Sequence, residues 1–234
     1  MTLYETISTR RQVRKFHAAS LNQKILDEIL TFTLETDQLL GQKAVFRLAS
    51  IDEMNGGTAP HYILGFCEPN SSAFANIGYV LQKTDLYIQS RGLGSGWFMN
   101  AKPKANTENF CIALAFGSTD VPMRKNENDF KRLPVNEISP TDNTVAQAVR
   151  LAPSSLNSQP WRLDFADGKL LIHDAGHGMK RIILKNKLNK IDTGIAARHS
   201  VLALEHDGKK ILSVTPQSGA KDFSIEISYT KGEI

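Results

Sequence analysis

The sequence has no hydrophobic run long enough to cross a membrane. No uninterrupted apolar segment of the chain approaches the ~20 residues that a membrane-spanning helix needs. The opening stretch, MTLYETISTRRQVRKF, has neither the apolar core nor the small-residue cleavage site of a signal peptide. We therefore expect a cytoplasmic protein with no membrane partner.

Cysteine is scarce, and its two occurrences fit neither a disulfide framework nor a metal site. Cys67 and Cys111 both lie in apolar, strand-like runs, where buried reduced thiols are commoner than disulfides. The histidines form no H-E-x-x-H or similar ligand pair, and His173 and His177 stand in a segment expected to be a loop. We expect no metal ion.

A complete dinucleotide fingerprint is also missing. The segment RGLGSGWFMN follows a helix-like run rather than a strand, and Trp97 occupies the third glycine position. A glycine-rich strand and loop beside a flat ligand is the alternative for this segment. The net charge of +4 comes from short, scattered basic clusters. This suits a small phosphate better than a nucleic-acid backbone, and no platform of aromatic and basic residues favours nucleic-acid binding.

What the sequence does have is an internal repeat. IGYVLQKTDLYIQSRG and TGIAARHSVLALEHDG are both amphipathic helix patterns, and their glycines correspond at one offset of 116 residues, Gly78 with Gly194 and Gly92 with Gly208. VFRLAS matches PWRLDF at an offset of 115 residues, and FCIALAF matches FSIEISY at 113. The alternative is chance recurrence of helix and strand units of similar length.

The repeat predicts an α+β fold made of two similar halves. In the first half we expect helices or strands at residues 22–36, 43–50, 61–67, 71–91 and 109–117, and in the second at 141–151, 160–165, 169–174, 191–206, 210–214 and 222–229. Residues 1–125 and 141–234 would be the halves, and residues 126–140 a connector. The halves would pack about a pseudo-twofold axis as one compact unit.

A basic cluster lies in and after an amphipathic helix that the N-terminal sequence predicts, with apolar positions at Leu3 and Ile7 and a candidate third at Val13. In ISTRRQVRKF, Arg10 and Arg14 would stand one helical turn apart and could converge on one anion. The planar guanidinium group suits phosphate because it donates two hydrogen bonds at once. The alternative is an exposed basic helix end that complements its own dipole.

Two further segments carry groups that could bind a ligand. In APSSLNSQPW, Pro153 and Pro160 fix the backbone of a loop whose hydroxyls and amides could contact the edge of a heterocycle. A plain helix-to-strand turn uses the same residue types. In DFKRLPVNEI, Lys131 and Arg132 lie in a polar stretch that, taken alone, is typical of a solvated linker.

Taken together, these segments resemble the nitroreductase family of FMN-dependent NAD(P)H oxidoreductases. The resemblance rests on ISTRRQVRKF, the glycine-ending helix with GLGSGWF, KRLP and APSSLNSQPW, which together cover most of the chain. In ordinary members the P-S-S-x-N-x-Q-P-W loop closely follows the arginine motif, whereas here it stands in the other half. The chain is therefore most similar to single-chain nitroreductases, and the resemblance implies a monomer that acts as an internal pseudo-dimer.

The resemblance also implies one FMN per chain, held by both halves. The residues that it implies at the flavin are Arg10, Arg11, Gln12, Arg14, Met99, Asn100, Lys131, Arg132, Pro153, Ser154, Ser155 and Asn157. Arg10 and Arg132, with help from Lys131, would hold the phosphate. Arg14 would stabilise negative charge on the reduced ring.

The remaining implied roles concern the flavin ring. The main chain of Met99 and Asn100 would lie near flavin N5, while the serine and asparagine loop would pack against the ring and ribityl chain. Gln12 stands where the family commonly has serine, so its reach differs. No side chain is assigned as catalytic, because flavin N5 carries the chemistry.

The implied reaction is hydride transfer from NAD(P)H through the flavin to a nitroaromatic, a quinone or a similar conjugated small molecule, with ping-pong kinetics. The alternative is a flavin-binding protein of the same fold with weak or no reductase activity, used as a carrier or sensor. A third class, a basic module that binds nucleic acid, lacks support in the sequence.

Overall fold

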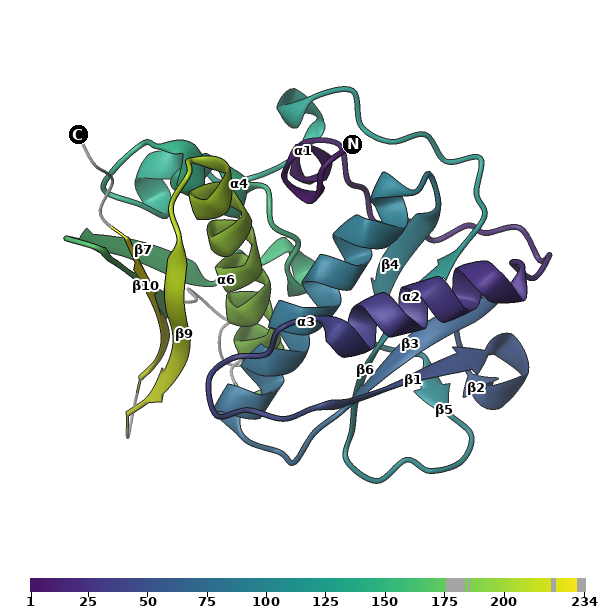
Figure 1. The fold of residues 1–234 in the computed structure, drawn as a ribbon. Coiled ribbons are helices and arrows are strands. Elements are labelled where there is room, and N and C mark those ends of the chain that lie inside the picture. The colour runs from purple at the N-terminus through teal and green to yellow at the C-terminus, as the bar shows by residue number, and fades with distance from the viewer. Residues whose placement is uncertain (176–183, 185, 220–221, 231–234) are drawn as a thin grey trace.

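A computed structural model describes residues 1–175, 184, 186–219 and 222–230 (Figure 1). Two long helices, α3 (Ser71–Ser90) and α6 (Leu188–His206), cross in the middle of the molecule. A four-stranded antiparallel sheet lies on each side of them. The chain therefore has a mixed α+β fold with a helical centre.

The first half contains α1, α2 and the sheet β1-β3-β6-β4. Its elements are α1 (Leu3–Ile7), α2 (Gln23–Glu35), β1 (Val45–Ser50), η1 (Ile51–Glu53), β3 (His61–Phe66), β4 (Gly94–Phe98) and β6 (Phe110–Gly117). A short ladder pairs β2 (Met54–Asn55) with β5 (Lys102–Pro103). The α2 helix covers this sheet on the side seen in Figure 1.

The second half contains α4 and the sheet β7-β8-β10-β9. Its elements are α4 (Thr144–Arg150), η4 (Ser155–Asn157), β7 (Trp161–Ala166), β8 (Lys169–Asp174), β9 (Ile211–Ser218) and β10 (Phe223–Tyr229). The connector between the halves forms two short turns, η2 (Glu127–Asp129) and η3 (Val135–Glu137).

Local sequence signals account for the two central helices. The Asn70 side chain caps α3 by accepting a hydrogen bond from Ala73 N–H at 2.9 Å. Both helices end at glycines in the left-handed region, Gly92 with φ 78° and Gly208 with φ 74°, a conformation that costs glycine little. Every residue of α6 from 189 to 204 is buried, as expected for a helix surrounded by protein.

The two sheets have the same connectivity. In each half the chain forms two adjacent strands, then the long helix, then an outer strand. The last strand of each half lies between the second strand and the outer strand, so β1-β3-β6-β4 corresponds to β7-β8-β10-β9. The contact between the helices is also reciprocal. A Cβ on Gly78 would lie 2.0 Å from the Ile191 carbonyl oxygen, and one on Gly194 would lie 1.9 Å from that of Ala75. The second member of each equivalent pair follows the first by 116 residues.

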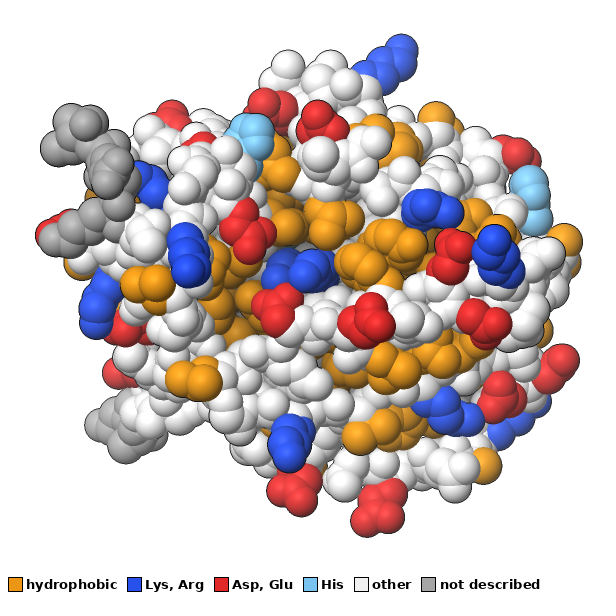
Figure 2. Space-filling view, in the orientation of Figure 1, with side chains coloured by type: hydrophobic (Ala, Val, Ile, Leu, Met, Phe, Trp, Pro, Cys, Tyr) orange, Lys and Arg blue, Asp and Glu red, His pale blue; other side chains and the backbone are white. Residues whose placement is uncertain are grey.

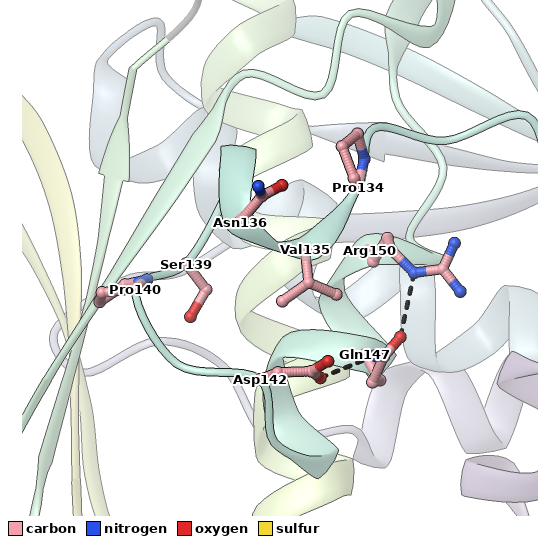
Figure 3. Close-up of a pocket in the computed structure, with 8 residues that line it drawn as sticks. All are labelled: Pro134, Val135, Asn136, Ser139, Pro140, Asp142, Gln147 and Arg150. Carbon is pink, nitrogen blue, oxygen red and sulfur yellow. Dashed lines mark hydrogen bonds between the residues drawn. The ribbon is translucent and has the colours of Figure 1, made fainter.

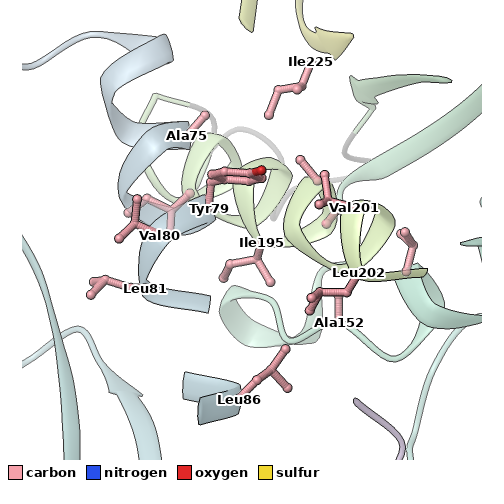
Figure 4. Close-up of a cluster of buried hydrophobic side chains, with 14 of the residues drawn as sticks. Ala75, Tyr79, Val80, Leu81, Leu86, Ala152, Ile195, Val201, Leu202 and Ile225 are labelled. Atoms are coloured by element: carbon pink, nitrogen blue, oxygen red, sulfur yellow. The ribbon is translucent and has the colours of Figure 1, made fainter. Parts of the chain in front are cut away.

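One hydrophobic cluster joins the two halves. Tyr79 of α3 packs near Ile195 and Val201 of α6, with Ala152 and Ile225 of the second half around them (Figure 4). Because this cluster includes strands of both sheets, neither half has a separate core around the central helices. The halves are therefore packed as one unit.

One expectation about the first half is wrong. The α1 helix ends at Ile7, so Arg10 and Arg14 lie in an extended segment and are not one helical turn apart. The GLGSGWF segment forms β4 at the edge of the sheet, paired with β6, which agrees with the glycine-rich strand alternative and gives this half a fourth strand beyond the expected elements. Val13 N–H donates to the Ser95 carbonyl at 2.9 Å, so the N-terminal segment lies along β4 instead of continuing α1.

Candidate functional site

A pocket of about 540 Å³ opens where the two halves meet. Its lining residues are Arg10, Gln12, Arg14, Trp97, Met99, Ile112, Arg124, Asp129, Lys131, Arg132, Pro153, Ser154, Ser155, Leu156, Asn157, Ile191, Asp192 and Ile195. They come from the N-terminal segment, β4, β6, the connector, the loop at η4 and α6. The size is typical of a site for a small organic ligand.

The extended N-terminal segment decides which of its side chains face the pocket. Side chains alternate along an extended chain, so Arg10, Gln12 and Arg14 line the pocket while Arg11 points elsewhere. The main chain of Arg11 is held by Gln89, whose Oε1 accepts the Arg11 N–H at 2.8 Å and whose Nε2 donates to the Arg11 carbonyl at 2.9 Å.

Gln12 links this segment to β4. Its Nε2 donates to the Trp97 carbonyl at 3.0 Å, and its Oε1 accepts the Trp97 N–H at 3.1 Å. Gly96 permits the close approach, because a Cβ there would lie 2.4 Å from the Val13 carbonyl oxygen. Serine, with its shorter side chain, could not make both bonds.

A buried carboxylate, that of Asp85, forms an ion pair with Arg10. The Arg10 side chain is almost completely buried, and its Nε lies 3.0 Å from Oδ2 of the fully buried Asp85. Asp85 also accepts hydrogen bonds from Ser95 Oγ and Gln89 Nε2. Among the described residues, Arg10 Nη2 has no hydrogen-bond partner. A buried donor left in this way costs free energy, which an acceptor on a ligand would recover.

Two more arginines add positive charge at the same end of the pocket. Arg124 lies with its guanidinium carbon 4.0 Å from the centre of the Phe130 ring. Burial, together with the charge of Arg10, lowers the pKa of both Arg124 and Arg132 to about 10. Within the described part of the chain, Arg132 Nε is buried without a hydrogen-bond partner. This crowding of cations favours a bound anion.

One face of the molecule carries charges of both signs. On the face shown in Figure 2, acidic and basic side chains of the described residues are interspersed, with hydrophobic side chains exposed between them. The described residues on this face therefore show no broad basic patch of the kind that a nucleic-acid backbone would need.

The loop at η4 has a constrained backbone. Leu156, Asn157 and Gln159 have positive φ values of 53°, 53° and 48°. Non-glycine residues in this region cost about 1–3 kcal/mol each and occur where the surroundings enforce them. Here Gln159 N–H donates to Ser154 Oγ at 2.9 Å, and Gln159 Oε1 accepts the Leu133 N–H at 2.9 Å. The loop is more than a plain helix-to-strand turn.

The connector is fastened to this loop. Arg132 Nη1 donates to Asn157 Oδ1, and Asn157 Nδ2 donates to the Lys131 carbonyl at 2.9 Å. Phe130 is buried beside them. The segment is therefore not a solvated linker along its length, and it brings two cations to the pocket.

Asp192 of α6 contacts the loop at η4 through Ser155. It is almost completely buried, yet it lines the pocket. Its Oδ2 accepts the Ser155 N–H at 2.9 Å, and its Oδ1 accepts the Ser155 hydroxyl at 3.2 Å. Burial raises the pKa of Asp192 to about 8, against the opposing effect of the Ser155 bonds.

Comparison with known families identifies the chain. A family model described as "Putative TM nitroreductase" matches residues 2–204. The chain belongs to this nitroreductase family. No curated protein matches it.

The chain is similar to solved nitroreductase structures, and one of them shows the fold. A protein described as a putative nitroreductase from Thermotoga maritima is 19% identical, covers 97% of this chain and 94% of its own, and has a TM-score of 0.72. An FMN-dependent nitroreductase from Clostridium difficile is 18% identical over 54% of this chain and 93% of its own, with a TM-score of 0.43. Nitroreductase A from Vibrio parahaemolyticus is 14% identical over 58% and 80%, with a TM-score of 0.42. The first match extends over both halves of the chain and shows the fold.

The pocket of this nitroreductase gathers most of the residues that the sequence predicted. Those that line it are Arg10, Gln12, Arg14, Met99, Lys131, Arg132, Pro153, Ser154, Ser155 and Asn157. Arg11 and Asn100 are not among the lining residues. The alternation of the extended chain accounts for Arg11, and Asn100 is an exposed residue beyond the end of β4. The flavin contacts of all twelve stay predictions.

Sequence reasoning missed three charged groups. Asp85 directly follows Lys83 and Thr84, and Asp192 stands next to Thr193, so neither is marked in the sequence as a charge in an apolar stretch. Arg124 was visible only as part of a short basic cluster. Its N–H donates to the Thr9 carbonyl at 2.9 Å, a contact between distant segments that carries no local sequence signal.

A second hollow, of about 460 Å³, lies between η3 and α4 (Figure 3). Its polar side chains bond to one another: Arg150 Nε donates to Gln147 Oε1 at 3.0 Å, and Gln147 Nε2 donates to Asp142 Oδ1 at 2.7 Å. Because these groups are satisfied within the protein, the hollow gives no sign of a ligand.

The remaining predictions concern cysteine, histidine and the membrane. Cys67 and Cys111 are free and buried, as expected. His173 belongs to β8 rather than a loop, with Nε2 3.0 Å from Asp164, while His177 lies outside the described residues. The described helices include none with the length and hydrophobicity that a membrane crossing requires.

Proposed function

We propose that this nitroreductase binds one FMN in the pocket and transfers hydride from NAD(P)H to a nitroaromatic, a quinone or a similar conjugated acceptor. One observation carries the proposal: guanidinium groups of the N-terminal segment and the connector meet the polar loop of the second half in a single pocket. This is the arrangement that the resemblance to flavin-dependent nitroreductases implied.

The lining residues fit a flavin mononucleotide. Arg10, Arg124 and Arg132 would hold its phosphate, each charged hydrogen bond contributing about 1.5–3 kcal/mol. The unpartnered donors Arg10 Nη2 and Arg132 Nε are available for this among the described groups. Trp97 and Met99 offer flat or flexible apolar surface to the ring.

A bound flavin would supply the redox chemistry by taking up hydride and passing the electrons on. The chain's own task is to bind, orient and stabilise. Arg14 lines the pocket and would favour the negative charge that develops on reduction. Met99 is about half exposed at the pocket, so donor and acceptor can use one opening in turn, which predicts ping-pong kinetics.

We infer that residues 1–125 and 141–234 are related by a pseudo-twofold axis, so that one chain acts as an internal pseudo-dimer. The identical strand order and the reciprocal glycine contacts support this. So does a loop contact: Leu39 N–H donates to Asn76 Oδ1 at 2.9 Å, as Ser155 N–H does to Asp192, with both partners shifted by 116 residues. Leu39 has no hydroxyl, so this counterpart lacks the polar group that Ser155 brings to the flavin pocket. One FMN per chain follows.

The visible absorption spectrum of the purified protein tests this proposal. We expect flavin bands with a flavin-to-chain ratio near one, and bleaching by NADH or NADPH followed by reoxidation with a quinone or nitro compound. A ratio near two would contradict the single site, and absence of flavin binding would overturn the proposal. Flavin that no nicotinamide reduces would favour the carrier or sensor.

A further inference from the structure

The hydroxyl group of Ser155 donates its only proton in a hydrogen bond to Asp192. The Ser155 N–H and hydroxyl both donate to the Asp192 carboxylate, at 2.9 and 3.2 Å. Both residues line the pocket, and Ser155 is half-buried there. A hydroxyl has one donor and two acceptor lone pairs. With its proton turned to Asp192, Ser155 can offer only lone pairs to a ligand.

We propose that Asp192 is a positioning residue whose protonation decides whether the Ser155 hydroxyl donates or accepts a hydrogen bond toward the flavin. When Asp192 is ionised, the Ser155 hydroxyl donates to it and presents an acceptor to the pocket. When Asp192 takes a proton from solvent, its own O–H donates to Ser155 Oγ, and the serine proton is released to donate into the pocket. This inference rests on the proposed FMN site.

The surroundings of Asp192 support such a change near neutral pH. Burial raises the pKa of Asp192 to about 8, and the charge of Asp174, at the end of β8, adds to the rise. Asp174 is itself bonded to Lys190. Across the pocket, the charged residues of the connector are Lys131, Arg132 and Asp129.

The counterpart position in the first half cannot do this. There Asn76 receives the Leu39 N–H, and its Nδ2 donates to Gln38 Oε1 at 2.8 Å. An amide does not titrate, and leucine has no hydroxyl. The pairing of a buried acid with a serine is therefore specific to the pocket rather than a requirement of the helix packing.

The direction of the effect follows from charge. Ionised Asp192 places a negative charge beside a site for an anionic ligand and removes the serine donor, so FMN should bind more weakly above pH 8. We expect its dissociation constant to rise about fivefold from pH 7 to pH 9, for a differential interaction of about one pKa unit that reaches its full tenfold only at higher pH. A phosphate monoester, whose second pKa is about 6, stays almost fully dianionic over this range.

Titration of the apoprotein with FMN, followed by flavin fluorescence, tests the inference. In Asp192→Asn the amide Nδ2 can donate to Ser155 Oγ while Oδ1 accepts the Ser155 N–H, as in the protonated acid. We expect this variant to keep the wild-type pH 7 affinity through pH 9. Asp37→Asn is the matched control: this acid, bonded to Arg198 and Lys83, is not among the pocket's lining residues, and its variant should keep the wild-type profile.

A second variant covers the case in which Asp192→Asn does not fold. Ser155→Ala removes the hydroxyl and keeps the main-chain bond to Asp192. With riboflavin, which lacks the phosphate charge, we expect wild-type affinity to fall between pH 7 and pH 9 and the affinity of Ser155→Ala to stay constant. Wild-type affinity that does not change with pH would overturn the inference. So would a fall in affinity from pH 7 to pH 9 in Asp192→Asn or Ser155→Ala as large as that of the wild type. Absence of any flavin binding by the wild type would instead overturn the proposed function.

Discussion

Replacement of Arg132 with alanine is expected to weaken FMN binding about 100-fold, because charged hydrogen bonds contribute about 1.5–3 kcal/mol each and 1.4 kcal/mol is a factor of ten. Arg132 presents a buried, unpartnered Nε among the described groups and lines the cationic end of the pocket. The same change should leave stability nearly unaltered. It removes the hydrogen bonds to Asn157 and the Leu151 carbonyl, but it also relieves the repulsion from Arg10 and Arg124 that lowers the Arg132 pKa.

Comparison of FMN with riboflavin separates the two roles that Arg132 can have. If the side chain holds the phosphate, Arg132→Ala should lose FMN affinity and keep most of its riboflavin affinity, as measured by fluorescence titration. An equal loss for both ligands would show that Arg132 acts only through Asn157 and the loop. Arg47→Ala is the control: this partly exposed arginine pairs with Glu53 at 2.9 Å outside the pocket lining, so the variant should bind both ligands as the wild type does.

The fold was largely predictable because the residues that reveal the repeat in the sequence are those that make close contacts in the structure. Gly78 and Gly194 are glycines because each faces a carbonyl of the opposite helix, and this shared requirement kept their spacing readable in the sequence. The end of α1 was not predictable from periodicity. Arg11 and Val13 have their main-chain groups bonded to Gln89 and to β4, and tertiary contacts of this kind override a local helical pattern.

The candidate site was predictable for residues that belong to a recognisable motif. It was not predictable for residues outside the motifs that only the fold brings to the pocket. Arg10 and Ser155 stand in distinctive motifs, and both line the pocket. Arg124 reaches it only because the chain that follows β6 returns to the N-terminal segment. Asp85 and Asp192 serve the site by bonding Arg10 and Ser155 from buried helix positions, so their role depends on packing that no local spacing encodes.

The largest expected loss of stability comes from adding one methyl group where α3 and α6 cross. In Gly78→Ala the new Cβ would meet the Ile191 carbonyl at 2.0 Å, and in Gly194→Ala the Ala75 carbonyl at 1.9 Å. Both obstacles are main-chain atoms of well-packed helices, so relief requires the helices to separate and the surrounding core to lose contacts. We expect each variant to lose about 3 kcal/mol or more, which lowers the melting temperature by roughly 6–12 °C.

Gly208→Ala provides the control for this pair. Gly208 has φ 74°, and no atom lies within 4 Å of its ideal Cβ, so alanine there should cost only about 1 kcal/mol for its backbone conformation. Gly78→Ala and Gly194→Ala should destabilise by similar amounts if the contacts are equivalent. Their combination should cost less than the sum of the two, because separation of the helices by one methyl group already makes room for the other. Additive losses, or losses no greater than that of Gly208→Ala, would show that the two glycines do not share one close crossing.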